Sequence, residues 1–199
     1  MRLGSSLFDY YILNRVPVAL PLREYFLFCS VLLMCFSTSV HSMSRSHDNE
    51  ISFQTGIYLP HGGDNERYNT LSAEYRYDQA WIPDHGAYPI GGCLFTSAGD
   101  VFLFAGLMKH YYITENFVSS ISFSPSFYHY GGRSRDLNFP LEFRSKVEFS
   151  YELPNRARMG VGVSHFSNAM LSRVFRGLSN PGVEVVSLSY TMPLRDLLF

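Results

Sequence analysis

The stretch LEFRSKVEFSYE, residues 141–152, alternates almost throughout between two kinds of side chain. Leucine, valine and aromatic residues share one side of an extended chain, and glutamate, arginine and lysine share the other. This period of two predicts a β-strand. A solvent-exposed sheet of a soluble protein shows the same alternation. The aromatic content, together with the signs of export described below, favours the wall of a membrane barrel, with the charged row filling its interior.

Seven further segments share the alternation, the aromatic content and the length of roughly ten residues that are typical of tilted membrane strands. The eight candidates are Ile51–Leu59, Thr70–Tyr77, Tyr88–Thr96, Val101–Tyr112, Phe117–Tyr128, Leu141–Leu153, Ala157–Asn168 and Val183–Leu194. We therefore predict an all-β protein, an eight-stranded antiparallel transmembrane β-barrel of the bacterial outer membrane. The third strand is the least regular, because it contains Pro89 and a glycine pair.

The connections between these segments fit an up-and-down barrel. Residues 114–116 and 154–156 form short turns, whereas the connections near 60–69, 131–138 and 169–182 are longer. All three longer connections fall on the extracellular side if both termini are periplasmic. Phe199, the last residue, also resembles the terminal signature of outer-membrane barrels.

The N-terminal region has the features of a secretory signal peptide. Arg23 precedes an apolar run, Tyr25–Phe36, and small residues follow up to Ser42. The run is shorter than the roughly 20 residues that a spanning helix needs, so an uncleaved anchor is the lesser alternative. We predict a signal peptide with a long n-region over residues 1–42 and one barrel domain over residues 43–199.

The composition excludes some classes of function. Sixteen basic and 17 acidic residues give a formal charge of −1, which offers no footprint for nucleic acid. Only Cys93 lies beyond the N-terminal stretch, so a processed chain has no intrachain disulfide. No spacing suggests metal ligation, and we expect four histidines to be surface or interfacial residues. These are His61, His85, His110 and His129.

A candidate catalytic set lies near the C-terminus. His165 and Ser167 continue the apolar row of one predicted strand, and Glu184 lies on the apolar row of the next. A nucleophile, a base and a carboxylate that supports the base are what an ester hydrolase needs. Polar groups on a lipid-facing row are costly unless they satisfy one another or lie near the membrane interface. The three residues border a long extracellular loop, which suggests an ester of an outer-leaflet lipid as the substrate.

Four segments give the chain a resemblance to a known family: His165-Phe166-Ser167-Asn168-Ala169, Asn180-Pro181-Gly182-Val183-Glu184, Tyr190-Thr191-Met192-Pro193 and Phe139-Pro140-Leu141-Glu142-Phe143. These segments resemble the PagL-type lipid A 3-O-deacylases of the outer membrane. The resemblance covers the C-terminal third in sequence and the rest mainly in architecture. Residues 170–179 depart from the family pattern by their extra length, which bears on substrate preference.

The resemblance implies a Ser-His-Glu esterase that cleaves the ester-linked acyl chain at the 3-position of lipid A. It implies that His165, Ser167 and Glu184 are catalytic, that Asn180 is an oxyanion donor and that Asn168 shapes the site. It implies neither a metal nor an organic cofactor. The expected partners are lipid A or lipopolysaccharide, the outer membrane and its assembly machinery, with the protein a monomer or a homodimer.

Two further questions are left open by the sequence. Arg173 and Arg176, with Arg133 and Arg135, either bind lipid A phosphates through charge-assisted hydrogen bonds or are solvated loop charges. The alternatives to the deacylase are a lipase or phospholipase that acts on another lipid ester, and a non-enzymatic small barrel such as an adhesin or structural protein.

Overall fold

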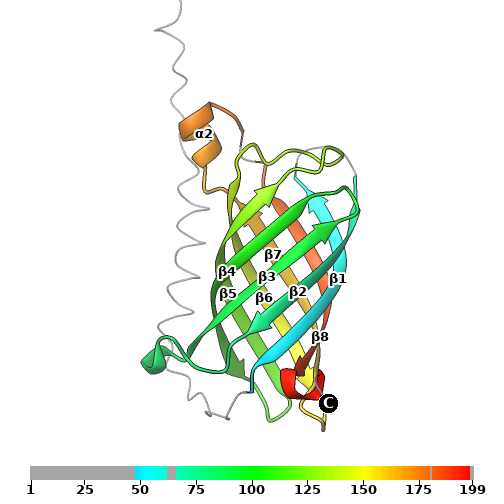
Figure 1. The fold of residues 1–199 in the computed structure, drawn as a ribbon, viewed down its shortest axis with the longest axis vertical. Helices are drawn as coiled ribbons and strands as arrows, with labels where there is room; N and C mark the ends of the chain where they lie inside the picture. The colour runs from blue at the N-terminus through cyan, green and yellow to red at the C-terminus, as the bar shows by residue number, and fades with distance from the viewer. Residues whose placement is uncertain (1–47, 62–65, 180, 198–199) are drawn as a thin grey trace, which may run out of the picture. The chain divides into compact units, whose positions relative to one another are not determined.

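The computed structural model describes residues 48–61, 66–179 and 181–197. Within them, eight antiparallel strands form a closed barrel in chain order (Figure 1). The strands are β1 (Glu50–Pro60), β2 (Tyr68–Arg76), β3 (Ala87–Thr96), β4 (Val101–Tyr112), β5 (Phe117–His129), β6 (Leu141–Glu152), β7 (Arg158–Ser167) and β8 (Val183–Pro193). The predicted fold is confirmed, and every predicted strand end lies within two residues of the observed one. The predicted signal peptide, Asn180 and Phe199 lie outside the described residues.

The barrel closes through the pairing of the first and last strands. β1 runs antiparallel to β8 from the pair Glu50↔Pro193 to the pair Pro60↔Val183. Every strand therefore has a neighbour on both sides, and no edge is left to pair with another chain. The irregular strand β3 is no exception, because it is hydrogen-bonded to both β2 and β4.

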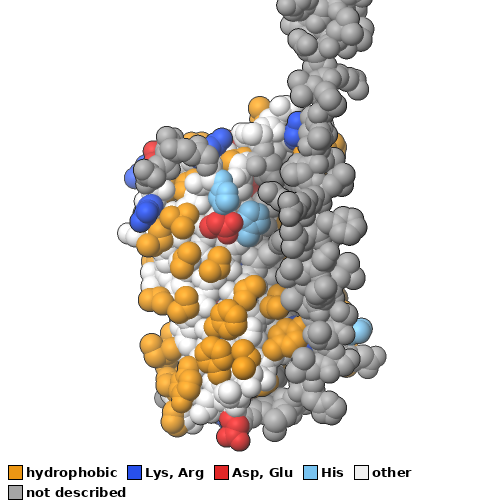
Figure 2. Space-filling model, turned by 180° about the vertical axis from the view of Figure 1, so that it is seen from behind, with side chains coloured by type: hydrophobic (Ala, Val, Ile, Leu, Met, Phe, Trp, Pro, Cys, Tyr) orange, Lys and Arg blue, Asp and Glu red, His pale blue; other side chains and the backbone are white. Residues whose placement is uncertain are grey.

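Apolar side chains cover the outer wall (Figure 2). Large exposed residues of this kind come from strands all around the barrel, among them Leu71, Leu103, Phe127, Phe149, Val161 and Leu188. Large apolar side chains exposed on so many strands are suited to lipid rather than to water. No helix in the described part of the chain is long and apolar enough to cross a membrane.

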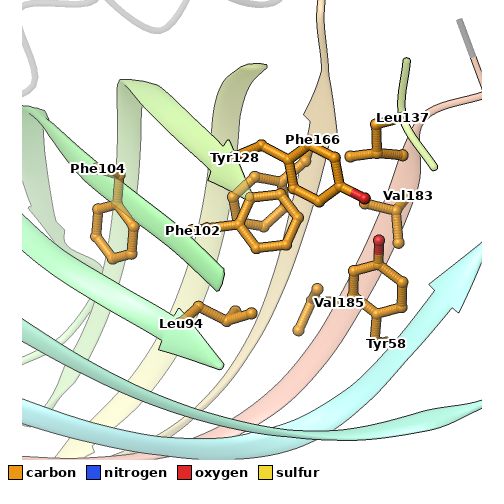
Figure 3. Packing of buried hydrophobic residues seen from close by; sticks show 9 residues of the cluster. All are labelled: Tyr58, Leu94, Phe102, Phe104, Tyr128, Leu137, Phe166, Val183 and Val185. Carbon is orange, nitrogen blue, oxygen red and sulfur yellow. The ribbon is translucent and has the colours of Figure 1, made fainter. Parts of the chain in front are cut away.

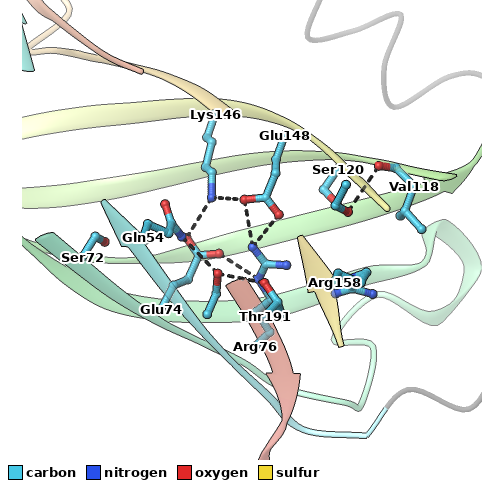
Figure 4. Close-up of polar contacts among 12 residues, drawn as sticks. Gln54, Ser72, Glu74, Arg76, Val118, Ser120, Lys146, Glu148, Arg158 and Thr191 are labelled. Atoms are coloured by element: carbon cyan, nitrogen blue, oxygen red, sulfur yellow. Dashed lines mark hydrogen bonds and ion pairs between the residues drawn. The ribbon is translucent and has the colours of Figure 1, made fainter. Parts of the chain in front are cut away.

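Charged side chains fill the middle of the barrel, as the alternation of β6 predicts. Glu74 accepts hydrogen bonds from Arg76 Nε at 2.9 Å and Arg144 Nη1 at 2.8 Å. Glu148 accepts hydrogen bonds from Arg76 Nη2 at 3.0 Å and Lys146 Nζ at 2.5 Å (Figure 4). All five side chains are almost completely buried. This mutual pairing is what makes charged groups tolerable inside a barrel surrounded by lipid.

An aromatic cluster packs inside the barrel, contributed by strands including β1, β4, β7 and β8 (Figure 3). The ring centroid of Phe102 lies 4.5 Å from that of Phe166 and 4.9 Å from that of Tyr128. Val183 and Val185 of β8 are buried in the same cluster. The cluster thus packs against the inner faces of β7 and β8, on the opposite side of the wall from His165, Ser167 and Glu184.

The connections named above lie at the ends that the sequence predicts, but residues 77–86, between β2 and β3, form a longer connection at the end where the short turns lie (Figure 1). The short turns lie at the end that carries the C-terminal 3₁₀ helix η2 (Leu194–Leu197), and the β7–β8 connection lies at the opposite end (Figure 1). That connection contains a six-residue helix, α2 (Leu171–Arg176), which was predicted only as loop. A second 3₁₀ helix, η1 (Pro83–His85), lies between β2 and β3.

The prediction that His110 is a surface or interfacial residue is wrong. Its side chain is buried inside the barrel, where Nδ1 lies 2.7 Å from the hydroxyl of Ser120. It belongs to the inward row of β4 with Phe102, Phe104 and Met108, and Ser120 lies directly opposite it on β5.

Candidate active site

The alternation of β7 decides which way its candidate residues point. Phe166 and Asn168 are fully buried in the interior. His165 and Ser167 are therefore on the outer wall, where both are partly exposed. Because Phe166 is anchored between them, the backbone that carries both residues is fixed from inside the barrel.

Glu184 lies directly opposite His165 in the β7–β8 ladder. Its neighbours, Val183 and Val185, are buried, so its own side chain also points outward. Glu184 Oε1 lies 2.8 Å from Nδ1 of His165, and the side chains are 32% and 35% exposed, respectively. A carboxylate bound to Nδ1–H keeps the proton on that nitrogen and leaves Nε2 free to accept another. The strand register, which the sequence left open, thus places a carboxylate against the imidazole, as a base and its orienting acid would require.

Ser167 lies two residues beyond His165 on the same face of β7, opposite Phe143 of β6. Among the described side chains, no hydrogen bond joins its hydroxyl to the imidazole. Two positions along a strand are separated by about 6.6–7 Å at the backbone, a distance that an imidazole leaning toward the hydroxyl can bridge. Such contacts often tighten only when substrate is bound.

His61 joins this group, and sequence reasoning missed it. The residue follows the end of β1, and its Nε2 lies 3.3 Å from Oε1 of Glu184. Its ring lies 6.2 Å from the ring of His165. Figure 2 shows histidine and acidic side chains side by side above the apolar wall. His61 is exposed, as expected of a surface residue. Sequence spacing did not reveal its partners, because the β1–β8 closure brings together residues far apart in the sequence.

Gly182 lies against the other side of the imidazole. A Cβ atom at this position would lie 3.3 Å from Cε1 and 4.0 Å from Nε2 of His165. The residue also has a φ of 62°, in the left-handed region that glycine adopts without strain. Glycine here therefore leaves room at the edge of the ring that would accept a proton.

Asn168 ties the loops beneath the site to the barrel. Its Nδ2 donates to the carbonyl of Leu137 at 3.0 Å and to Glu142 Oε1 at 3.3 Å. Its Oδ1 accepts from the hydroxyl of Ser172, in helix α2, at 3.2 Å. The side chain thus connects β7 with the β5–β6 loop and with α2. The other predicted amide, Asn180, lies outside the described residues.

The loop arginines lie around the same end of the barrel. Arg176 Nη1 donates to the carbonyl of Asn138 at 3.0 Å, and its guanidinium lies 5.3 Å from the ring centroid of Phe139. Arg135 Nη1 donates to the carbonyl of His61 at 2.9 Å. Arg173 is exposed on α2. Exposed guanidinium groups are suited to anionic head groups, but the loops at this end also carry the acidic residues Glu66 and Asp136.

Comparison with known proteins identifies one matching family model, described as Lipid A 3-O-deacylase (PagL), over residues 47–193. No curated protein matches. Among solved structures, the "Crystal structure of the outer membrane enzyme PagL" aligns with 72% of this chain and 99% of its own, with a TM-score of 0.53 and 19% identity. A structure from "De novo design of transmembrane beta-barrels" aligns with 73% of this chain and 96% of its own, with a TM-score of 0.46 and 10% identity.

Proposed function

Because this chain belongs to the lipid A 3-O-deacylase (PagL) family, we propose that it is an outer-membrane ester hydrolase that removes the acyl chain from the 3-position of lipid A by a Ser-His-Glu mechanism. One observation carries the mechanism. The His165–Glu184 hydrogen bond lies on the lipid-facing wall, on the same strand face as Ser167. A lipid ester reaches that wall from within the outer leaflet, so the substrate does not have to leave the membrane.

In the proposed reaction, Nε2 of His165 takes the proton of the Ser167 hydroxyl as the oxygen attacks the ester carbonyl. Glu184 holds the imidazole through Nδ1 and stabilises the imidazolium that forms. The tetrahedral intermediate then collapses with cleavage of the bond to the sugar 3-oxygen, and His165 gives its proton to that departing oxygen, which becomes the free 3-hydroxyl. Water attacks the acyl-enzyme by the same route, which frees the fatty acid and restores Ser167.

Three further assignments complete the proposal. Asn180 donates a hydrogen bond to the oxyanion, and Asn168 shapes the site through the loops that it connects. Arg173 and Arg176 bind the phosphates of lipid A. Residues 1–42 act as the export signal, and the outer-membrane assembly machinery inserts the barrel of residues 43–199. His165, Ser167 and Glu184 come from a single chain, so a monomer suffices for catalysis.

The substrate is tested with barrel refolded in detergent and incubated separately with lipid A and with glycerophospholipid. Mass spectrometry of the products is expected to show loss of one 3-hydroxyacyl chain from lipid A and no change in the phospholipid. Fatty acid released mainly from the phospholipid would replace the deacylase with a phospholipase. Unchanged lipids of both kinds would favour a non-enzymatic barrel.

Glu184→Gln is expected to lower the rate of deacylation about 100-fold, at the lower end of the effect of general acid–base groups. The amide keeps the shape but stabilises neither the tautomer nor the imidazolium as a carboxylate does. Because Glu184 is partly exposed, water replaces some of its effect. Initial rates with lipid A measure the loss. The outward neighbour Val186 provides the control Val186→Ala, which is expected to stay within a few-fold of wild type. Equal rates for Glu184→Gln and wild type would remove Glu184 from the mechanism.

Gly182→Ala is expected to slow deacylation several-fold more than Gly177→Ala. Both glycines have left-handed backbones, with φ values of 62° and 66°. A methyl group at position 177 would meet no atom within 4 Å, whereas one at position 182 would crowd His165. The comparison separates crowding of the imidazole from backbone strain, which both variants share. Equal rates for the two variants would show that space beside His165 does not limit the reaction.

A further inference from the structure

We propose that His61, His165 and Glu184 form a binding site for a divalent transition-metal ion such as Zn²⁺, and that an ion bound there switches off the esterase. One ligating atom from each residue lies within 4.8 Å of the other two. Metal binding stands on this geometry alone, whereas inhibition rests on the proposed function.

The ligand chemistry favours zinc over the alkaline-earth ions. Two imidazoles and one carboxylate are a recurrent zinc ligand set, whereas magnesium and calcium prefer oxygen ligands. With metal–ligand bonds of about 2.0–2.2 Å, tetrahedral ligand atoms lie roughly 3.4 Å apart. Glu184 Oε1 already lies 2.8 Å from His165 Nδ1 and 3.3 Å from His61 Nε2. The ligand atoms of the two histidines lie within 4.8 Å of each other, so side-chain rotations that draw them together bring the three atoms onto one ion.

The surroundings allow an ion to enter and help to hold one ligand in place. The side chain of His61 is 52% exposed and that of Glu184 is 32% exposed, which leaves a fourth position for water. The backbone of His61 is fixed on both sides, because its N–H donates to the carbonyl of Gly182 at 3.4 Å and its carbonyl accepts from Arg135 Nη1. His165 and Glu184 are fixed by strand pairing. The ligands are thus largely preorganised.

Inhibition follows from the tautomer of His165. The nitrogen that faces Glu184 is Nδ1, and it must give up its proton to bind a metal. The neutral ring then carries its one proton on Nε2. That nitrogen can no longer accept the proton of Ser167, and Glu184 is held by the ion as well. Metal binding therefore removes both the base and its support without touching the nucleophile.

Binding is tested by isothermal titration of ZnCl₂ into the refolded Ser167→Ala barrel, prepared without a polyhistidine tag. One saturable site is expected. Adding His61→Ala should weaken binding at least tenfold, whereas adding His85→Ala should leave it unchanged, since His85 is an exposed histidine outside this group. Absence of a saturable site, or equal binding with and without His61, would overturn the proposal.

Inhibition is tested by deacylation rates under rising ZnCl₂, each variant compared with its own metal-free rate. Wild type should lose activity, recover it on addition of a chelator, and require at least tenfold less zinc for half-inhibition than His61→Ala. Stoichiometric binding without loss of activity would overturn the inhibitory role. A wild type that is inactive without zinc contradicts the proposed function and the inhibition together, while the titration decides the metal site independently.

Discussion

Ser167→Ala is expected to lower lipid A deacylation by about 10⁴-fold or more while the barrel stays folded. The change removes the proposed nucleophile and leaves the His165–Glu184 pair intact. It also leaves the interior intact, because Ser167 lies on the outer face of β7, away from the aromatic cluster. Mass spectrometry of lipid A from membranes carrying each protein measures the reaction. Heat-modifiable migration on a denaturing gel shows that the barrel is present.

Ser145→Ala is the matched control. Ser145 lies in β6 directly opposite His165, is partly exposed on the outer wall, and carries the same functional group. Its hydroxyl is therefore the alternative nucleophile beside His165 in the β6–β7 pair. Near-wild-type activity of Ser145→Ala beside an inactive Ser167→Ala would assign the nucleophile. The opposite pattern would move the nucleophile to β6, and activity in both variants would exclude a serine mechanism at this wall.

The fold was predictable from sequence because alternation is a local signal. Residues 141–152 separate an apolar row from a charged row, and the structure places the two rows on the outer wall and in the interior. The same reasoning placed His165, Ser167 and Glu184 on outward rows. Helix α2 was missed because a six-residue helix between left-handed caps, Met170 and Gly177, has too few turns to show a period.

At the site, the sequence alone did not reveal which residues of different strands come into contact. The β7–β8 register, which places Glu184 opposite His165 rather than one residue away, has no local signal. His61 depends on closure of the barrel between β1 and β8, a pairing of residues far apart in the chain. His110 depends on which of the two mainly apolar rows of β4 faces the interior; the row that holds His110 does, so the imidazole meets Ser120. All three facts come from how strands meet, which is visible only in the folded barrel.

Phe166→Ala is expected to reduce both stability and activity, because this side chain links the core to the site. The ring is fully buried, and its centroid lies 4.5 Å from that of the Phe102 ring. Removing a buried phenylalanine side chain typically costs about 3–5 kcal/mol, since it leaves a cavity that neighbours fill only in part. The backbone of His165 and Ser167 then loses its anchor, and misplacement by about 1 Å is enough to cost up to 100-fold in rate. Urea unfolding in lipid vesicles and initial deacylation rates measure the two effects.

Phe127→Ala separates this anchoring role from the general loss of a phenylalanine. Phe127 is 58% exposed on the outer wall of β5, so its removal leaves no interior cavity. We expect a smaller loss of stability than in Phe166→Ala and a rate close to wild type. If Phe166→Ala unfolds more easily yet keeps its full rate while folded, the aromatic cluster supports the barrel but does not position the site. If its rate falls even where the barrel remains fully folded, the inward residue between histidine and serine is part of how the outward pair is held.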